Sequence, residues 1–455
     1  MFAIPTIAAF FAFVYLRPHE VFPALRGVSL PGVVMAVVLG FVLDVGLRIS
    51  RPRMSVLLTL ALTFFTLCII TVSIKAPEEL GKQTVVLLAS LVGFFVTSQA
   101  VSSLRALGTV ASIILGITLV LSALGVRQGL SSPICYVRGA NEITSAGEIV
   151  DGRPCTDDES CLEGGKPGLE YLCEKPGPFE THSIEGRVRF RGVLEDPNEL
   201  AMALAIGLPL ALGLYERKRT NARLGLVIGA IALTSACVIF TQSRSGQLAV
   251  LAALGVYFLR RFGKRGLLGA AFLAIPLMLL GGRSGSKAQS SSDERLECWH
   301  EALDMWRNNP FIGVGQGRFT EHHYLTAHNS FLLALAEMGP LGLFTWTAVL
   351  YVAFKGLIRI QIDFKDRPEA ASARTWATAL LASLAGLAVS SAFLSVTYHV
   401  VVWTFLGLAA GLYGIVRRHA PEWHIRFGLR DLLAIAGIDV ALVIFLTLYL
   451  RFKGI

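Results

Sequence analysis

Apolar residues in this chain fall mostly into blocks of roughly 17 to 25 residues, the length that spans a bilayer core as a helix. Such a helix satisfies its backbone hydrogen bonds within itself, which lipid cannot do for it. The composition agrees, because 54% of the residues are hydrophobic and only 16% are charged, whereas soluble globular chains carry about a quarter charged residues. The sequence therefore predicts an all-α, polytopic integral membrane protein that forms a single membrane domain over residues 1–455.

The blocks predict about 12 transmembrane helices, and the last, weaker block is a candidate thirteenth. If this last block spans fully, the residues after it lie on the outer side; if it lies flat, they stay inside. The first block lacks a basic n-region and no small-x-small cleavage pattern follows it, so we expect it to be retained. The expected spans are residues 2–16, 30–47, 54–72, 84–101, 104–125, 198–215, 222–240, 246–259, 266–281, 328–354, 375–393, 400–416 and 432–450.

Positive charges are distributed unequally between the two sides of this topology. With the N-terminus in the cytoplasm, the cytoplasmic loops hold 21 lysines and arginines and the short outer loops hold five. Because loops rich in Lys and Arg stay in the cytoplasm, this orientation is favoured. Two long loops, 126–197 and 282–327, then face outward. The formal charge of +9 follows from this topology and does not indicate nucleic-acid binding.

The loop 126–197 contains four of the seven cysteines. An even cluster in a polar loop suits an oxidising compartment and predicts two disulfides, while all three pairings stay open. Zinc binding and free thiols are the alternatives, but the spacings lack the paired C-x-x-C pattern of a zinc site. The four residues are Cys135, Cys155, Cys161 and Cys173.

The rest of this loop reads as irregular, because glycine, proline and acidic residues cluster between positions 147 and 178. The acidic run 157–159 could attract calcium, but it lacks the spacing of an EF-hand loop, so we expect a solvated acidic patch. At the end of the loop, Asp196 or Asn198 is expected to cap the next helix.

The loop 282–327 contains a different pattern. Over residues 294–308, large apolar side chains recur at spacings of three and four, which predicts an amphipathic helix with a tryptophan pair suited to the headgroup boundary. Asn309-Pro310 ends this helix, and three glycines at alternate positions from 313 to 317 predict a flexible turn. The apolar residues are Leu296, Trp299, Leu303 and Trp306.

Two arginines near the outer face are candidate functional residues, because ionisable groups are costly there and usually have a task. Arg244 lies in a very short turn, 241–246, where a guanidinium could grip a diphosphate with paired hydrogen bonds or could anchor the helix at the interface. Arg295 opens the amphipathic helix and could instead form a salt bridge to Glu294 or Glu297.

His328, where the second long loop enters a span, is a candidate base, since an imidazole can take a proton from a hydroxyl near neutral pH. The alternative is a polar helix cap. His322 and His323 resemble solvated loop residues, and no carboxylate pattern completes a metal site, so we expect no metal.

Two acidic residues fall within predicted spans. Asp44 can reach Arg48 one helical turn later. Glu337 precedes Met338-Gly339-Pro340, which predicts a kink in a long span. We expect structural pairing for both acids rather than a cavity-lining role.

The segment from Arg295 to Gly342 resembles the signature region of the O-antigen ligase and O-antigen polymerase superfamily, because several short motifs match together in order and spacing. Two upstream pieces, 192–201 and 241–246, also resemble it, whereas the cysteine loop is a departure. The motifs are Arg295 with Trp299 and Ala302, Asn309-Pro310 with Gly313-Val314-Gly315, Ala327-His328-Asn329-Ser330, and Glu337-Met338-Gly339 with Gly342.

The resemblance implies a bacterial inner-membrane enzyme whose active site faces the periplasm. It implies a metal-independent, inverting transfer of a glycan from an undecaprenyl-diphosphate donor to an acceptor hydroxyl, without a cofactor. By resemblance, Arg244 and Arg295 hold the diphosphate and His328 is the base. Second-rank candidates for acceptor or headgroup contacts are Arg191, Asn198, Asn329 and His323.

The acceptor separates the possible activities. A polymerase, which we slightly prefer, uses a second lipid-linked glycan, a ligase uses lipid A core, and a protein oligosaccharyltransferase uses a protein. The lipid bilayer, and in such pathways a flippase and a chain-length regulator, are the expected partners. A lipid-linked sugar transporter is an alternative from another class, but charges are scarce inside the spans. A third class of function is a structural assembly subunit with a degenerate site.

Overall fold

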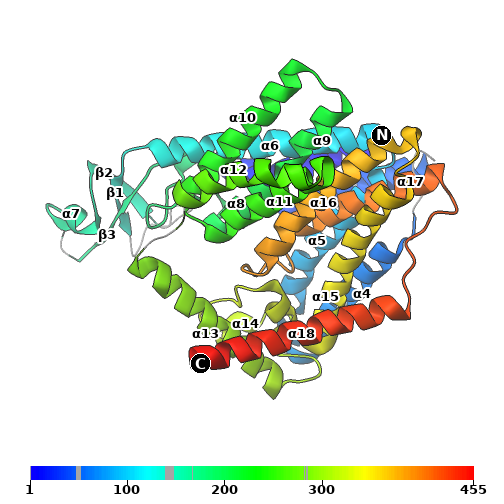
Figure 1. Ribbon diagram of the computed structural model, residues 1–455. Helices are drawn as coiled ribbons and strands as arrows, with labels where there is room; N and C mark the ends of the chain where they lie inside the picture. Colours follow the sequence, from blue (N-terminus) through cyan, green and yellow to red (C-terminus); the bar gives the residue numbers. More distant parts are fainter. Residues whose placement is uncertain (1, 48–52, 139–147, 167, 281, 283–284) are drawn as a thin grey trace.

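A helix covers most described residues of each of the thirteen apolar blocks in the computed structural model, which describes residues 2–47, 53–138, 148–166, 168–280, 282 and 285–455. The chain is mostly helical, with one small sheet at the edge of a helical bundle (Figure 1). The helices are α1 Ala3–Leu16, α2 Pro18–Val21, α3 Leu30–Gly46, α4 Val56–Lys75, α5 Leu80–Ala100, α6 Leu104–Leu130, α7 Asp158–Leu162, α8 Pro197–Gly207, α9 Pro209–Arg217, α10 Asn221–Phe240, α11 Arg244–Phe262, α12 Lys264–Leu280, α13 Ser286–Asn308, α14 Phe319–His322, α15 Ser330–Asp363, α16 Ala371–Ser391, α17 Val400–His419 and α18 Leu429–Lys453. The strands are β1 Ile134–Arg138, β2 Glu148–Pro154 and β3 Glu170–Glu174.

Within these described ranges, eight helices are long and apolar enough to cross a bilayer. They are α4, α5, α6, the α8–α9 pair, α10, α15, α17 and α18. The apolar helices α1 and α3 are shorter, at 14 and 17 residues. Arginines at both ends of α11, and the many small and hydroxyl-bearing residues of α16, reduce the apolar character of those helices. A multi-pass membrane protein is therefore confirmed, while the number of 12 or 13 crossings stays a prediction.

Proline interrupts two of the predicted spans. The block 198–215 is divided into α8 and α9 at Leu208, because Pro209 has no N–H with which to continue the helix. In α15, Gly339 leaves the helical conformation (φ 67°, ψ −166°) directly before Pro340, so the predicted kink is confirmed.

The kink leaves two backbone carbonyls of α15 available, and the loop after α13 uses both. The Val314 N–H donates to the Ala336 carbonyl and the Gly315 N–H donates to the Glu337 carbonyl, each at 2.9 Å. The turn that the sequence predicted as flexible is therefore held against α15 by backbone hydrogen bonds.

Two glycines make this close contact possible. A Cβ on Gly313 would lie 2.4 Å from the Ala336 oxygen, and a Cβ on Gly339 would lie 2.3 Å from the Phe311 oxygen. Both glycines also have a positive φ, which residues with a side chain rarely adopt. The loop and the kink consequently fit each other only because both positions lack side chains.

The same loop is tied to the turn between α4 and α5. The Lys75 ammonium donates to Asn309 Oδ1 at 2.9 Å, and the Lys75 carbonyl accepts from Arg318 Nη1 at 2.7 Å. We call the end of the bundle that carries this loop, α13 and the sheet the site end, and the other the opposite end. Both long loops thus lie at one end of the bundle, and that this end faces outward stays a prediction.

The predicted amphipathic helix is confirmed, and α13 begins eight residues earlier than expected, at Ser286 rather than residue 294. Its apolar face, with Leu303 at its centre, packs against α15 and against Leu446 and Leu450 of α18. Since Asp431, near the start of α18, hydrogen-bonds to Lys355 in the distal half of α15, α18 runs from the opposite end to the site end.

The prediction of irregular structure between residues 147 and 178 is wrong. This segment contributes β2 and β3 to an antiparallel sheet with the order β2-β1-β3. The strands are only five to seven residues long and charged residues interrupt their apolar alternation, so the sequence pattern lacks a strand signal.

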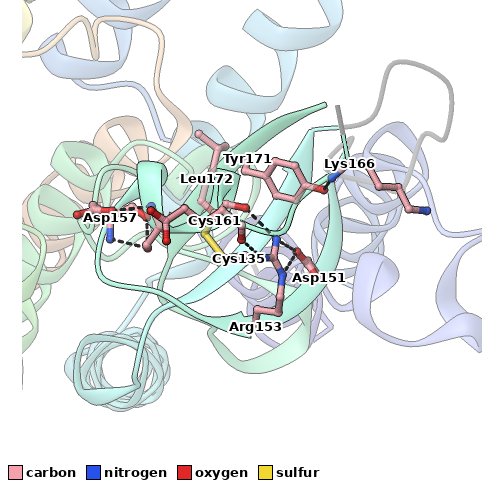
Figure 2. A network of polar contacts seen from close by, with 10 residues as sticks. Cys135, Asp151, Arg153, Asp157, Cys161, Lys166, Tyr171 and Leu172 are labelled. Atoms are coloured by element: carbon pink, nitrogen blue, oxygen red, sulfur yellow. Dashed lines mark hydrogen bonds and ion pairs between the residues drawn. A yellow bond between two sulfur atoms is a disulfide. The ribbon is translucent and has the colours of Figure 1, made fainter. Parts of the chain in front are cut away.

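Two disulfides hold this sheet, as predicted, and pair Cys135 with Cys161 and Cys155 with Cys173. The sulfur atoms are used in these bonds, so they do not form a thiolate zinc site. Around the first disulfide, Arg153 donates to the Cys161 carbonyl at 2.8 Å and pairs with Asp151 (Figure 2).

The acidic run 157–159 has structural partners. Asp157 caps α7 by accepting the Ser160 N–H at 2.8 Å, and Asp158 accepts the Cys173 N–H at 2.7 Å. Within the described chain, these carboxylates therefore serve the fold of the loop.

Both acidic residues inside predicted spans have structural roles, although with partners other than expected. Asp44 accepts the N–H groups of Phe2 and Ala3 and so stabilises the first turn of α1; the expected partner, Arg48, lies outside the described residues. Glu337 accepts the Phe319 N–H at 3.1 Å and the Tyr398 hydroxyl at 2.7 Å, which joins the site-end loops to α15.

The core of the bundle is aromatic at its centre. Trp403 of α17 lies 4.5 Å from the Phe65 ring of α4 and 5.9 Å from the Trp346 ring of α15, measured between ring centroids. Such tilted contacts are favourable beyond the area they bury, so the helices that carry the site-end loops are joined by a packed core.

Candidate active site

A small polar hollow lies at the site end, between α8, α11 and α13. It is lined by both Arg244 and Arg295, the two arginines that the family resemblance implies bind the diphosphate. The hollow encloses only about 30 Å³, so its side chains lie close to one another. Its lining residues are Arg187, Asn198, Gln242, Arg244, Ser291, Ser292 and Arg295.

Arg244 is placed by the tight turn before α11. Gln242 adopts a left-handed conformation (φ 52°), and the Ser243 hydroxyl then caps the helix by accepting the Gly246 N–H at 3.1 Å. Arg244 is therefore the first residue of α11, where the unpaired N–H groups of a helix start add to the positive potential. This position suits a group that binds an anion.

Arg295 reaches the hollow from the other side, on α13. Ser291 and Ser292 precede it by four and three residues, which places the three side chains on one face of the helix. The hollow thus has one guanidinium from the transmembrane bundle and one from the loop helix.

Arg187 and Asn198 form the floor of the hollow, and the Asn198 side chain joins Arg187 to Ser243 in the turn before α11. Buried Arg187 donates to the Thr241 carbonyl and to Asn198 Oδ1, both at 3.0 Å. Asn198 Oδ1 also accepts the Ser243 hydroxyl at 2.8 Å. This network fixes the turn that carries Arg244.

His328 lies between buried Ala327 and Asn329, the N-cap of α15, and has a left-handed backbone (φ 47°). Within the part of the chain that the structure describes, no group hydrogen-bonds to its imidazole ring. Burial lowers the pKa of His328 below its usual range, and the Arg295 cation lowers it further, against the opposing effect of Asp196. The imidazole is therefore neutral at neutral pH, and it lies within the electrostatic reach of Arg295.

Part of this chain matches a known protein family. Residues 229–347 match the family model described as O-antigen ligase. This region is O-antigen ligase-like. The chain is also 24% identical over 227 residues to the exopolysaccharide production protein ExoQ of Rhizobium meliloti (strain 1021). That match covers 42% of this chain and 52% of the relative, so it spans about half of the relative's length.

The family resemblance predicted from the motifs is thereby confirmed. The O-antigen ligase-like region contains three of the proposed site residues, Arg244, Arg295 and His328. It does not contain Arg187 or Asn198, so the floor of the hollow is supplied by the chain before this region.

Three second-rank candidates have partners within the fold. Asn329 caps α15 by accepting the N–H groups of Phe331 and Leu332, and its amide donates to the Ala392 carbonyl at 3.2 Å. Asn329 therefore fixes the backbone next to His328. A role in substrate contact stays a prediction for it.

Arg191 and His323 are not among the residues that line the hollow. Arg191 donates to the Phe179 carbonyl and lies 3.8 Å from the Glu20 carboxylate. His323 bonds to Leu325 and lies 3.4 Å from Glu297 of α13, so it ties the segment before α15 to the loop helix.

Sequence reasoning missed Arg187 and Gln242 as site residues. Arg187 was visible as the first of three arginines at alternate positions, but its role depends on Thr241 and Asn198 in other segments. Gln242 lies in the same short turn as Arg244, and that proximity was the available signal.

Proposed function

We propose that this protein transfers a glycan from an undecaprenyl-diphosphate-linked donor to an acceptor hydroxyl during synthesis of a surface polysaccharide. The observation that carries the proposal is the meeting of Arg244 and Arg295 in one hollow. His328 is not among the residues that line it, but burial and the Arg295 cation both lower the pKa of His328. All three lie in the region that matches the O-antigen ligase family.

The proposed reaction is a single displacement with inversion at the anomeric carbon. The bond between this carbon and the diphosphate oxygen breaks, and the diphosphate leaves as an anion. Arg244 and Arg295 stabilise the negative charge that grows on it, and a prearranged pair of cations does so without reorganisation at the moment of reaction. We propose that no metal ion is required for this stabilisation.

His328 acts as the general base in this proposal. It accepts the proton of the acceptor hydroxyl while the hydroxyl oxygen forms the new bond to the anomeric carbon. Burial and the Arg295 cation keep the ring unprotonated, which leaves a nitrogen lone pair available for this proton. The proton then passes to solvent, and the enzyme returns to its starting state.

We place this reaction at the periplasmic face of the bacterial inner membrane. Two observations support the orientation: the loops at the opposite end carry the excess of lysine and arginine, and the two disulfides at the site end suit an oxidising compartment. A lipid-linked donor and a flippase that delivers it are the corresponding partners.

Among the possible acceptors, we favour a second lipid-linked glycan, which makes the protein a polymerase. The support is the similarity to a protein named for exopolysaccharide production. A chain-length regulator would then be a further partner. If the acceptor were lipid A core or a protein, a different outer surface of this protein would bind it, but the chemistry at the diphosphate would be the same.

The proposal is tested with purified protein, a lipid-linked oligosaccharide donor, and either a second lipid-linked unit or lipid A core as acceptor. Product formed with only one acceptor assigns the activity. We expect His328→Ala and Arg295→Gln each to reduce turnover by about 100-fold or more, the usual effect of losing a general base or a charge-stabilising group.

Two matched variants serve as controls. Arg307→Gln removes an arginine from the exposed part of the same helix, and His322→Ala removes an exposed histidine of the same loop. Both should turn over like the native protein. Normal product formation by His328→Ala would refute the base assignment, and activity lost in EDTA and restored by a divalent cation would refute the metal-independent reaction.

A further inference from the structure

A second basic cavity lies at the opposite end of the bundle. Its volume is about 340 Å³, and it lies where the start of α4 meets the ends of α5 and α17. Lys75, the last residue of α4, lies at the site end, so the length of α4 separates this cavity from the candidate active site. Three of its lining residues are Arg53, Arg417 and Arg418.

Arg53 is the unusual group in this cavity. Its Nη1 and Nη2 atoms are buried, and within the described chain neither has a hydrogen-bond partner. Withdrawing cationic donors from water without giving them acceptors is costly. A planar guanidinium matches the oxygens of a carboxylate or a phosphate, so an anion is the ligand that such donors would bind.

The backbone of Arg53 is held firmly. Its N–H donates to Gln99 Oε1 at 2.8 Å, and its carbonyl accepts from Gln99 Nε2 at 3.0 Å. The guanidinium lies against the backbone of α17, because a Cβ on Gly414 would be 2.7 Å from Arg53 Nη1. Two contacts from two different helices therefore define the position of this cation.

Among the described residues that line the cavity, the positive charges have no acidic partner. The lining residues include no Asp or Glu, and the sequence of residues 48–52 contains none. Arg417 and Arg418 donate to neutral carbonyls, those of Met54 and Ser102. Three cations thus share one cavity, with hydroxyl and amide groups from Ser55, Ser98 and Gln99 beside them.

We propose that this cavity binds the phosphate of an anionic glycerophospholipid from the leaflet at the opposite end. The cavity lies at the ends of membrane-spanning helices, which is the depth of lipid headgroups, and basic groups next to a membrane attract anionic lipid. Exposed Met54 and the Ala410 and Tyr413 side chains add an apolar wall beside the arginines, which fits a lipid better than a free ion. This site is independent of the transfer reaction.

The test uses the full chain, purified and freed of lipid in a neutral detergent, with the melting temperature measured during titration. The probes are phosphatidylglycerol, phosphatidylcholine and inorganic phosphate. We expect phosphatidylglycerol to raise the melting temperature saturably, since a ligand that binds only the folded state stabilises it. Phosphatidylcholine and inorganic phosphate should not reproduce this rise.

Arg53→Gln should shift half-saturation by phosphatidylglycerol by about tenfold or more, through loss of charge-assisted hydrogen bonds. Without lipid this variant should melt no lower than the native protein, because it removes a cation whose buried Nη1 and Nη2 atoms have no hydrogen-bond partner among the described residues. The double variant Arg417→Gln/Arg418→Gln changes two exposed residues of the same cavity and should also weaken the response. Arg105→Gln, an exposed arginine at the same end but outside the lining, is the matched control.

Three results would overturn the proposal. The first is an equal phosphatidylglycerol response in the native protein and in both cavity variants. The second is equal stabilisation by phosphatidylcholine or inorganic phosphate, which would refute a lipid phosphate as the ligand. The third is a melting temperature of Arg53→Gln far below that of the native protein without lipid, which would show that the guanidinium already has a structural partner.

Discussion

His328 shows how one residue depends on its neighbours in the chain and on one residue across the fold. Asn329 caps α15 and so fixes the backbone beside the histidine, while Ala327 is buried in the apolar cluster under α13. Arg295 approaches from α13 and lowers the pKa of the imidazole beyond the effect of burial. His328, the proposed base, is therefore coupled electrostatically to Arg295, which is proposed to bind the diphosphate.

This coupling predicts a specific pH dependence. His328 accepts a proton only when neutral, so the transfer rate should fall on the acidic side, through a pKa below the usual value for histidine. Arg295→Gln removes a cation that lowers this pKa, so the acidic limb should move to higher pH while the maximal rate falls. Initial rates measured from pH 5 to 8 test this. An unchanged acidic limb in the variant would contradict the coupling.

The sequence indicated the candidate cations but not the residues that hold them in place. Arg244, Arg295 and His328 could be named because they occupy motifs of a recognisable family. Arg187 could not, because its importance comes from hydrogen bonds to Thr241 and Asn198, which are close only in the folded chain. A single sequence contains no sign of such contacts.

At the scale of elements, the contact between the 313–315 turn and the kink in α15 determines where α13 lies. The turn follows α13 directly, and its N–H groups are bonded to the carbonyls that the kink leaves available. Arg295 lies in the first half of α13, and the contact that positions this helix lies after its C-terminal end.

Gly313→Ala tests this contact. The added Cβ would lie 2.4 Å from the Ala336 oxygen, and the left-handed backbone alone costs about 1–2 kcal/mol for a residue with a side chain. We expect a lower melting temperature and reduced turnover. Gly229→Ala in α10, where nothing lies within 4 Å of the new Cβ, should leave both unchanged. Equal behaviour of the two variants would show that the turn does not position α13.

Helices were predictable from the sequence because their apolar blocks are long, and even the α15 kink was visible as Gly339-Pro340. The sheet was not, because its strands are short and charged and because two disulfides, rather than an apolar face, hold it together. The start of α13 was placed too late, since residues 286–293 lack the apolar spacing on which the prediction relied.

At the scale of the whole molecule, the orientation can be tested through the cysteines. The four paired cysteines lie at the site end, whereas Cys68, Cys237 and Cys298 are buried free thiols. In intact spheroplasts, a membrane-impermeant maleimide should label the protein only after reduction. Replacing the four paired cysteines by serine should abolish this labelling. Labelling of the native protein that occurs only after the membrane is opened would reverse the orientation.

The direction of α18 also bears on whether the number of membrane crossings is odd or even. The first turn of α1 is held by Asp44 at the far end of α3, while Leu446 and Leu450 pack beside α13, and Figure 1 shows the two chain ends well apart. The first turn of α1 therefore lies at the opposite end of the bundle, and the last turns of α18 lie at the site end. If the two ends of the bundle face the two sides of a membrane, as we propose, the chain between α1 and the end of α18 crosses it an odd number of times, and of the two predicted numbers only thirteen is odd.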